Sequence, residues 1–238
     1  MSNLIDIAIA AHGGWERWEK LNTISAHLSV GGAIWPIKGF EGAYADIHCT
    51  VDTKVPLTRF TPFLKDGQTA VYRPHETAIL SDGAVIDSRQ EPRAAFAGHG
   101  LMTPWDEQNL IYFTGYAMWT YLTTPFLFRH PGFQAEEVEP WDEDGEIWRR
   151  LAVTFPADVA SHSTKQTFYF DATGLLRRHD YSVEIMGGTT SANYASDYKN
   201  FVGLNFPTKR RVYRTGPDNR PDRSRTSVSI DILNLSLA

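Results

Sequence analysis

The stretch from Ser161 to Met186 carries polar side chains where an ordinary strand face would bury apolar ones. Asp171-Ala172-Thr173-Gly174 has turn composition and separates two alternating runs, which predicts a β-hairpin. One face of that hairpin mixes apolar and polar groups: His162, Thr164, Gln166, Phe168, Phe170, Leu175, Arg177, His179, Tyr181, Val183 and Ile185. We expect the opposite face to be the wetter one, with the mixed face inside.

The mixed face contains groups that can move protons or bind an anion. His179 and Tyr181 are same-face neighbours about 7 Å apart, so an imidazole and a phenol could act on one substrate. Arg177 could pair with a carboxylate or phosphate on a ligand. His162 is expected about 14 Å from His179 along the ladder, too far for the two to share a metal. This pattern would suit an isomerase, cyclase or hydrolase that needs no cofactor.

That assignment depends on the register of the hairpin. A two-residue loop at Ala172-Thr173 pairs Phe168 with Arg177 and Gln166 with His179. A slip by one residue would exchange the two faces. A purely structural interpretation also stays open, in which Arg177 and His179 reach a sheet edge and Tyr181 is a core ring with a satisfied hydroxyl.

A binding function follows from the cost of burial. Polar groups inside a fold destabilise it unless they find partners, so a ligand cavity is one explanation of the mixed face. The predicted catalytic pair is His179 and Tyr181. The predicted ligand-binding residues are His162, Gln166, Phe168, Arg177, Tyr116 and Trp119.

A helix is expected to face this hairpin. Thr103 suits an N-cap, Pro104 the first helical position and Pro125 the stop, which predicts a helix to about Thr123. Its apolar residues surround it on all sides, so it must be buried. Its large rings are either filler or one wall of a pocket: Tyr112, Tyr116, Trp119 and Tyr121.

The remaining pattern is mostly short alternating runs. Residues 4–21 look helical with a break at Gly13-Gly14, and strands are expected from Thr23 to Trp35 and repeatedly thereafter. Asp66-Gly67 and Asp82-Gly83 are hairpin turns. The expected fold is mainly β: one domain over residues 1–238, with a large curved antiparallel sheet or open barrel enclosing the aromatic helix.

Composition limits the partners. The net charge of −5 argues against nucleic acid as the main partner. Positive charge concentrates in Lys209-Arg210-Arg211 and from Arg214 to Arg225, either as solvated chain or as a site for an acidic group. The single cysteine, Cys49, excludes an intramolecular disulfide and a cysteine-based zinc site, and no metal or cofactor is expected. The N-terminal stretch lacks a basic region before its short apolar run, which predicts a cytoplasmic protein without stable membrane insertion.

Two segments resemble a known fold. Residues 11–30, AHGGWERWEKLNTISAHLSV, resemble the helix-to-first-strand entry of the bacterial lipoprotein carriers and their relatives. Residues 168–181, FYFDATGLLRRHDY, resemble the central hairpin of that group. The resemblance implies a half-barrel with a hydrophobic cavity for acyl chains or similar molecules. The missing export signal argues for a cytoplasmic relative with a different ligand.

Three functions are therefore open. The first is binding of a hydrophobic or amphipathic small molecule, lipid-like or polyketide-like, in an internal cavity. The second is a cofactor-independent enzyme that uses His179 and Tyr181 in the same cavity; the sequence has no hydrolase elbow, phosphate loop or dinucleotide fingerprint. The third is an assembly protein with a filled interior. A homodimer formed through exposed strand edges is a further expectation.

Overall fold

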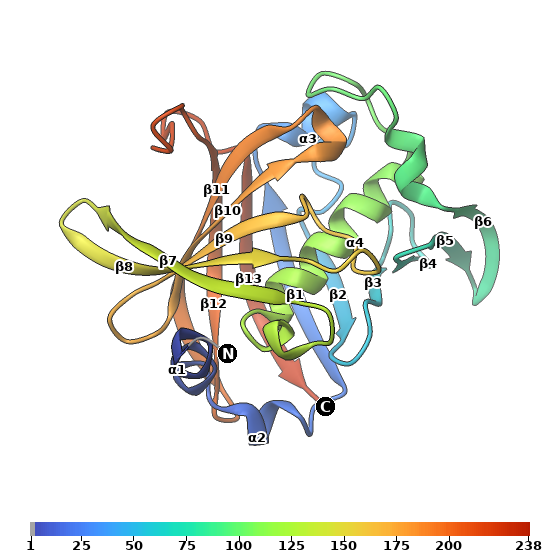
Figure 1. Ribbon diagram of the computed structural model, residues 1–238. Coiled ribbons are helices and arrows are strands. Elements are labelled where there is room, and N and C mark those ends of the chain that lie inside the picture. Colours follow the sequence, from blue (N-terminus) through green and yellow to red (C-terminus); the bar gives the residue numbers. More distant parts are fainter. Residues whose placement is uncertain (1–2) are drawn as a thin grey trace.

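The computed structural model describes residues 3–238 and wraps a 13-stranded antiparallel sheet around one central helix, α4 (Figure 1). The strands are β1 (Thr23–Gly31), β2 (Ile47–Asp52), β3 (Thr58–Thr61), β4 (Gln68–Arg73), β5 (Glu76–Ser81), β6 (Ala84–Gln90), β7 (Gln134–Glu143), β8 (Glu146–Thr154), β9 (Lys165–Phe170), β10 (Leu176–Val183), β11 (Thr189–Phe201), β12 (Leu204–Arg214) and β13 (Val228–Leu237). The helices are α1 (Asn3–Ala11), α2 (Trp15–Trp18), α3 (Ile34–Lys38) and α4 (Glu107–Thr123), with 3₁₀ turns η1 (Pro92–Phe96), η2 (Phe126–Arg129) and η3 (Glu184–Met186).

The sheet consists of two meanders. Strands β1 to β6 form one and β7 to β13 the other, and antiparallel pairing of β1 with β13 joins them. The outer strands β6 and β7 do not pair with each other, so the barrel stays open. The predicted mainly β fold, a curved sheet enclosing an aromatic helix, is confirmed.

Helix α4 is buried along almost its whole length, from Gln108 to Thr123. It begins later than predicted, because Asp106 rather than Thr103 is the N-cap. The Asp106 carboxylate accepts a hydrogen bond from the Asn109 backbone N–H at 2.8 Å, and the Asn109 side chain accepts one from the Asp106 N–H at 3.3 Å. Gly115 allows close contact with the sheet, since a Cβ there would lie 2.2 Å from the Tyr72 ring.

A short helix, α3, replaces the end of the strand predicted for Thr23 to Trp35. Strand β1 ends at Gly31, and Gly32 turns the chain with a φ of +117°. The buried Lys38 then fixes α3 to residues 97–105: its ammonium donates to the carbonyls of Gly100, Leu101 and Thr103 at 2.8–3.1 Å. This helix lies at the same end of the barrel as the β10–β11 connection (Figure 1).

The hairpin of β9 and β10 forms, but its predicted register is wrong. The Asp171 carboxylate accepts hydrogen bonds from the N–H groups of Thr173 and Leu175, so the loop is longer than two residues. A bulge between Leu176 and Arg178 then pairs His179 with Phe168 instead of Gln166.

The bulge preserves the inner face of the hairpin beyond it. Gln166, Phe168, His179 and Tyr181 are all buried inside the barrel. Arg177 lies at the bulge itself, with 36% of its side chain exposed.

The outer face of the same hairpin is the wetter one, as expected, with Lys165 and Glu184 exposed, but its centre is covered. Arg178 is fully buried there, and Tyr169 is 1% exposed. The turn end of the β7–β8 hairpin, with Trp141 and Glu143, covers them together with Asn219 from the β12–β13 connection. The alternation of residues within a strand does not show whether a segment distant in the sequence covers one of its faces.

The N-terminal stretch used above to argue against a signal begins with residues 1–2, which lie outside the described residues. In the described part of the chain, no helix has both the length and the apolar character required to span a membrane.

Candidate functional site: an apolar cavity with a polar floor

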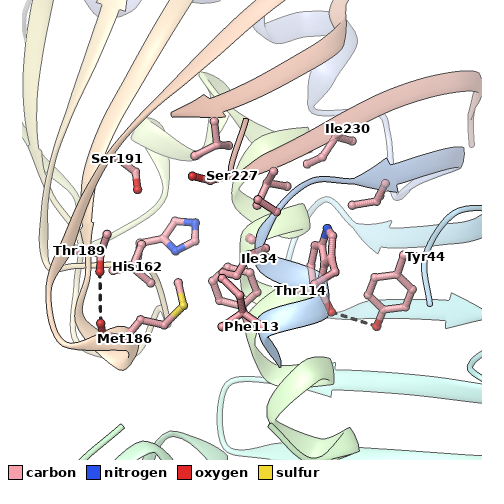
Figure 2. Close-up of a pocket in the computed structure, with 18 of the residues that line it drawn as sticks. Ile34, Tyr44, Phe113, Thr114, His162, Met186, Thr189, Ser191, Ser227 and Ile230 are labelled. Atoms are coloured by element: carbon pink, nitrogen blue, oxygen red, sulfur yellow. Dashed lines mark hydrogen bonds between the residues drawn. The ribbon is translucent and has the colours of Figure 1, made fainter. Parts of the chain in front are cut away.

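A cavity of about 340 Å³ lies between α4 and the inner face of the sheet (Figure 2). Its walls are mainly apolar and come from β1, α3, α4, β10 and β13, among them Leu28, Val30, Ile34, Phe113, Ala117 and Ile230. Figure 2 shows His162, Met186, Thr189 and Ser191 along one side of this space and Tyr44 with Thr114 along the other. The volume lies at the lower end of the range of about 300–1,000 Å³ that is usual for small-molecule sites.

The floor of the cavity is polar. Tyr121 from α4, Tyr181 from β10 and His162 from the segment before β9 all line it. The Tyr121 hydroxyl lies 2.8 Å from His162 Nε2 and 2.8 Å from the Tyr181 hydroxyl, while His162 Nδ1 lies 3.0 Å from the Tyr116 hydroxyl. The His162 and Tyr181 rings stack with centroids 3.9 Å apart. We call Tyr116, Tyr121, His162, His179 and Tyr181 the inner cluster.

His179 lies behind this floor and does not line the cavity. Its Nε2 is 2.5 Å from the Gln166 side-chain oxygen, and its ring stacks on Phe168 with centroids 4.0 Å apart. Its edge contacts Tyr181 at 4.8 Å between centroids. Since His162 also contacts the Tyr181 ring, the two imidazoles are much closer than the expected 14 Å. That expectation is wrong because His162 precedes β9 instead of belonging to its ladder.

Burial keeps the inner cluster uncharged. It lowers the pKa of His162 to about 3 and that of His179 well below its usual value, and raises the pKa of Tyr181 well above 10. A neutral imidazole has one donor and one acceptor, so His162 donates to one tyrosine oxygen and accepts from the other hydroxyl. The floor therefore presents neutral hydrogen-bonding groups to the cavity.

Arg210 on β12 fixes the end of α4 beneath the floor. Its Nη2 donates to the Tyr121 carbonyl at 3.0 Å, and its guanidinium lies 4.7 Å from the Tyr121 ring centroid. That carbonyl would normally accept from the residue four positions on, which is Pro125 and has no N–H. A cation also suits a helix C-terminus. From the sequence, Arg210 was assigned only to a basic run. Its place on the same strand face as Thr208 and Val212, which are buried, would have indicated that it points inward.

The other predicted residues lie at different depths. Tyr116 and Gln166 support His162 and His179 from behind the floor, and Phe168 packs under His179. Trp119 lies away from the cavity, where its indole N–H donates to the Asp52 carbonyl at 2.9 Å. Arg177 also lies outside, 3.9 Å from the Asp171 carboxylate, so the expected acid-binding cation is not at this cavity.

The mouth of the cavity was not recognised from the sequence as part of the site. Arg214, Asp222, Ser224 and Arg225 line it from the end of β12 and the following connection. Leu101 and α3 border it as well. Over residues 3–238, no group of three or more histidine, cysteine or acidic side chains has a metal-binding arrangement.

The comparisons with known proteins establish the fold. No family model and no curated protein matches the sequence. A LolA superfamily protein from Nitrosomonas europaea superposes with a TM-score of 0.55 at 11% identity, covering 99% of this chain and 92% of that one. A putative outer membrane lipoprotein-sorting protein domain from Vibrio parahaemolyticus gives 0.54 at 13% identity, covering 98% and 91%. A DUF1329 family protein from Desulfovibrio piger gives 0.52 at 13% identity, with the same coverage. The chain thus has the open-barrel fold of lipoprotein-carrier-like proteins, as its sequence resemblance indicated.

Proposed function

We propose that the protein binds a hydrophobic or amphipathic small molecule, lipid-like or polyketide-like, in the cavity between α4 and the sheet. The observation that carries this proposal is the apolar chamber of about 340 Å³ that ends in three neutral polar side chains, Tyr121, His162 and Tyr181. Protein interiors are otherwise close-packed, so apolar walls around an open space favour an apolar occupant.

The chemistry of the floor supports the same class of ligand. Hydroxyl and imidazole groups that already bond to one another add little charge, so the floor favours an apolar tail or a neutral polar end over an ion. The fold is also that of a domain described as lipoprotein-sorting, which supports a hydrophobic cargo by analogy.

Catalysis without a cofactor is the second candidate, and it has less support. His179 and Tyr181 lie side by side, with ring centroids 4.8 Å apart, as two groups that act on one substrate must. General acid–base catalysis works best when the pKa lies near the working pH, whereas burial moves the pKa values of both groups far from neutrality. The cavity surface also includes Tyr181 but not His179.

The proposal can be tested by mass spectrometry of an organic extract from natively folded protein. We expect a stoichiometric amphipathic molecule from the unaltered protein. Ala117 lines the cavity from α4, so Ala117→Phe should place a ring in the chamber and abolish co-purification. Ala117→Ser keeps the volume and should retain the molecule. An equal yield from folded Ala117→Phe would contradict the proposed site.

A further inference from the structure

Four arginines, one at the end of β12 and three in the connection to β13, divide into two pairs. Arg220 and Arg223 face acidic groups on the outside of the barrel: Arg220 lies 3.9 Å from Asp144, and Arg223 lies 3.2 Å from Glu143. Arg214 and Arg225 line the cavity mouth instead. Neither of these two forms an ion pair within 4.0 Å with any residue in the described range 3–238.

The mouth has one carboxylate, that of Asp222. Hydrogen bonds from Ser224 have the larger effect in lowering its pKa, and the Arg214 charge lowers it further and helps to keep the group ionised. One of its two oxygens accepts both of those bonds. Asp222 accepts hydrogen bonds from the Ser224 backbone N–H at 3.0 Å and from the Ser224 hydroxyl at 2.6 Å. The Asp222 N–H in turn donates to the Arg214 carbonyl at 2.8 Å, which fixes the connection against the end of β12. Two guanidinium groups and one carboxylate leave a net positive charge at the rim of an apolar chamber.

We propose that Arg214 and Arg225 bind the anionic headgroup, a carboxylate or a phosphate monoester, of a single-chain amphiphile whose tail fills the cavity. This inference rests on the proposed function. Guanidinium groups match both headgroups in shape and charge, and charge-assisted bonds are the stronger kind. The hydroxyls of Ser191 and Ser227 line the same cavity and can add neutral donors. The tail then points toward Tyr121 and the neutral floor.

The arrangement assigns the acid-binding role to residues other than Arg177. Along the inner face of β12, Arg214 is at the mouth and Val212 is in the wall, while Arg210 lies beneath the floor. The cation that meets an acidic head is therefore the one nearest solvent. A charged head can keep part of its hydration there, whereas burial beside Tyr121 would remove it.

Titrations with tetradecanoate, tetradecyl phosphate and tetradecanol separate the headgroup from the tail. We expect both anions to bind the unaltered protein at least tenfold more tightly than the alcohol. The double variant Arg214→Gln/Arg225→Gln should lose that preference and keep its affinity for the alcohol. Lys199→Gln is the control, because it removes one exposed positive charge on β11 that does not line the cavity.

Each result has a defined meaning. If the unaltered protein binds alcohol and acid equally, or if the double variant keeps the preference, the headgroup site is wrong and the proposed function stands. If none of the three probes binds, both proposals fail. Inorganic phosphate serves as a probe without a tail. If it binds as tightly as tetradecyl phosphate, the mouth is a site for a free anion, and the proposal of an amphiphilic ligand is overturned.

Discussion

The inner face of the β9–β10 hairpin and the centre of its outer face are both buried, yet they hold polar groups in opposite ways. Inside, His162, Tyr121 and Tyr181 form a neutral chain of hydrogen bonds beside an open cavity. Outside, Arg178 bonds to Glu143 at 3.0 Å and to Asp180 at 2.6 Å, in a closed ionic group. The inner groups are presented to a space that a ligand could fill, whereas the outer groups satisfy one another.

The outer group also has a visible structural role. Arg178 donates to the Asn219 carbonyl at 2.7 Å and lies 5.3 Å from the Trp141 ring centroid. It thereby joins the β7–β8 hairpin and the β12–β13 connection to the barrel. Asp222, Ser224 and Arg225, which line the mouth, belong to this same connection, so the outer group holds that side of the mouth in place.

The largest effect should come from breaking the outer group. Arg178→Met removes the central cation of the group, which leaves partly buried Asp180 without a cation and buried Glu143 with only the exposed Arg223, and we expect the free energy of unfolding to fall by about 3–5 kcal/mol. Denaturant unfolding measures this change. The adjacent Arg177→Met is the matched control; its partner is 3.9 Å away at the surface, and a loss within about 1 kcal/mol is expected. Equal losses would refute the contrast between the faces.

The inner cluster should limit stability in acid. The folded-state pKa of His162 is about 3, below its usual 6.5, so the unfolded chain binds more protons between these values. Its contribution is therefore complete above pH 6.5 and is lost as the pH falls toward 3. At pH 5 the resulting loss in the free energy of unfolding is about 2 kcal/mol.

The variant His162→Gln should reduce the pH dependence of unfolding between pH 6.5 and 4.5, while His179, whose pKa is also lowered by burial, keeps its own share of the slope. The outer group titrates lower: although burial acts to raise the pKa of Glu143, hydrogen bonds from Tyr194 and Trp141 and the Arg178 charge hold it below its usual value. Its contribution is present above pH 4.5 and is lost further into acid. An unchanged slope in His162→Gln would show that His162 does not titrate as described.

A smaller effect is expected from single hydroxyls on the floor. Tyr121→Phe removes the hydroxyl shared by His162 and Tyr181, and should cost about 1–3 kcal/mol because both partners stay buried. Tyr116→Phe removes one bond to His162 at 3.0 Å and should cost about 1 kcal/mol. Thermal or denaturant unfolding gives the order, and a larger loss in Tyr116→Phe would contradict the central place of Tyr121.

Local sequence signals account for much of the fold. The apolar surround of α4 predicted a buried helix, and alternation with turn residues predicted the antiparallel sheet. The register of the 161–186 hairpin depends on the length of its loop. The Asp171 carboxylate closes this loop by accepting hydrogen bonds from the N–H groups of Thr173 and Leu175. No alternation rule fixes that choice, and the bulge placed Arg177 outside the cavity.

The parts of the site that sequence reasoning missed depend on contacts between distant segments. Lys38 fixes α3 through carbonyls more than sixty positions away. Arg210 on β12 donates a hydrogen bond to the Tyr121 carbonyl at the C-terminal end of α4. Tyr181 was predicted as catalytic and His162 and Tyr116 as ligand-binding. The structure brings all three together, but the bonds that Tyr116 and Tyr121 make to His162 and Tyr181 depend on the packing of α4 onto the sheet.

The most direct test of the central claim is to map where a ligand lies. A tetradecanoate analogue with a photoreactive diazirine in its tail, activated after binding, should label residues of α4 between Phe113 and Tyr121. Labelling should be lost in Ala117→Phe and retained in Ala117→Ser. Labels confined to the outer surface, for example at the exposed Val85 and Ile86 of β6, would contradict an inner binding cavity.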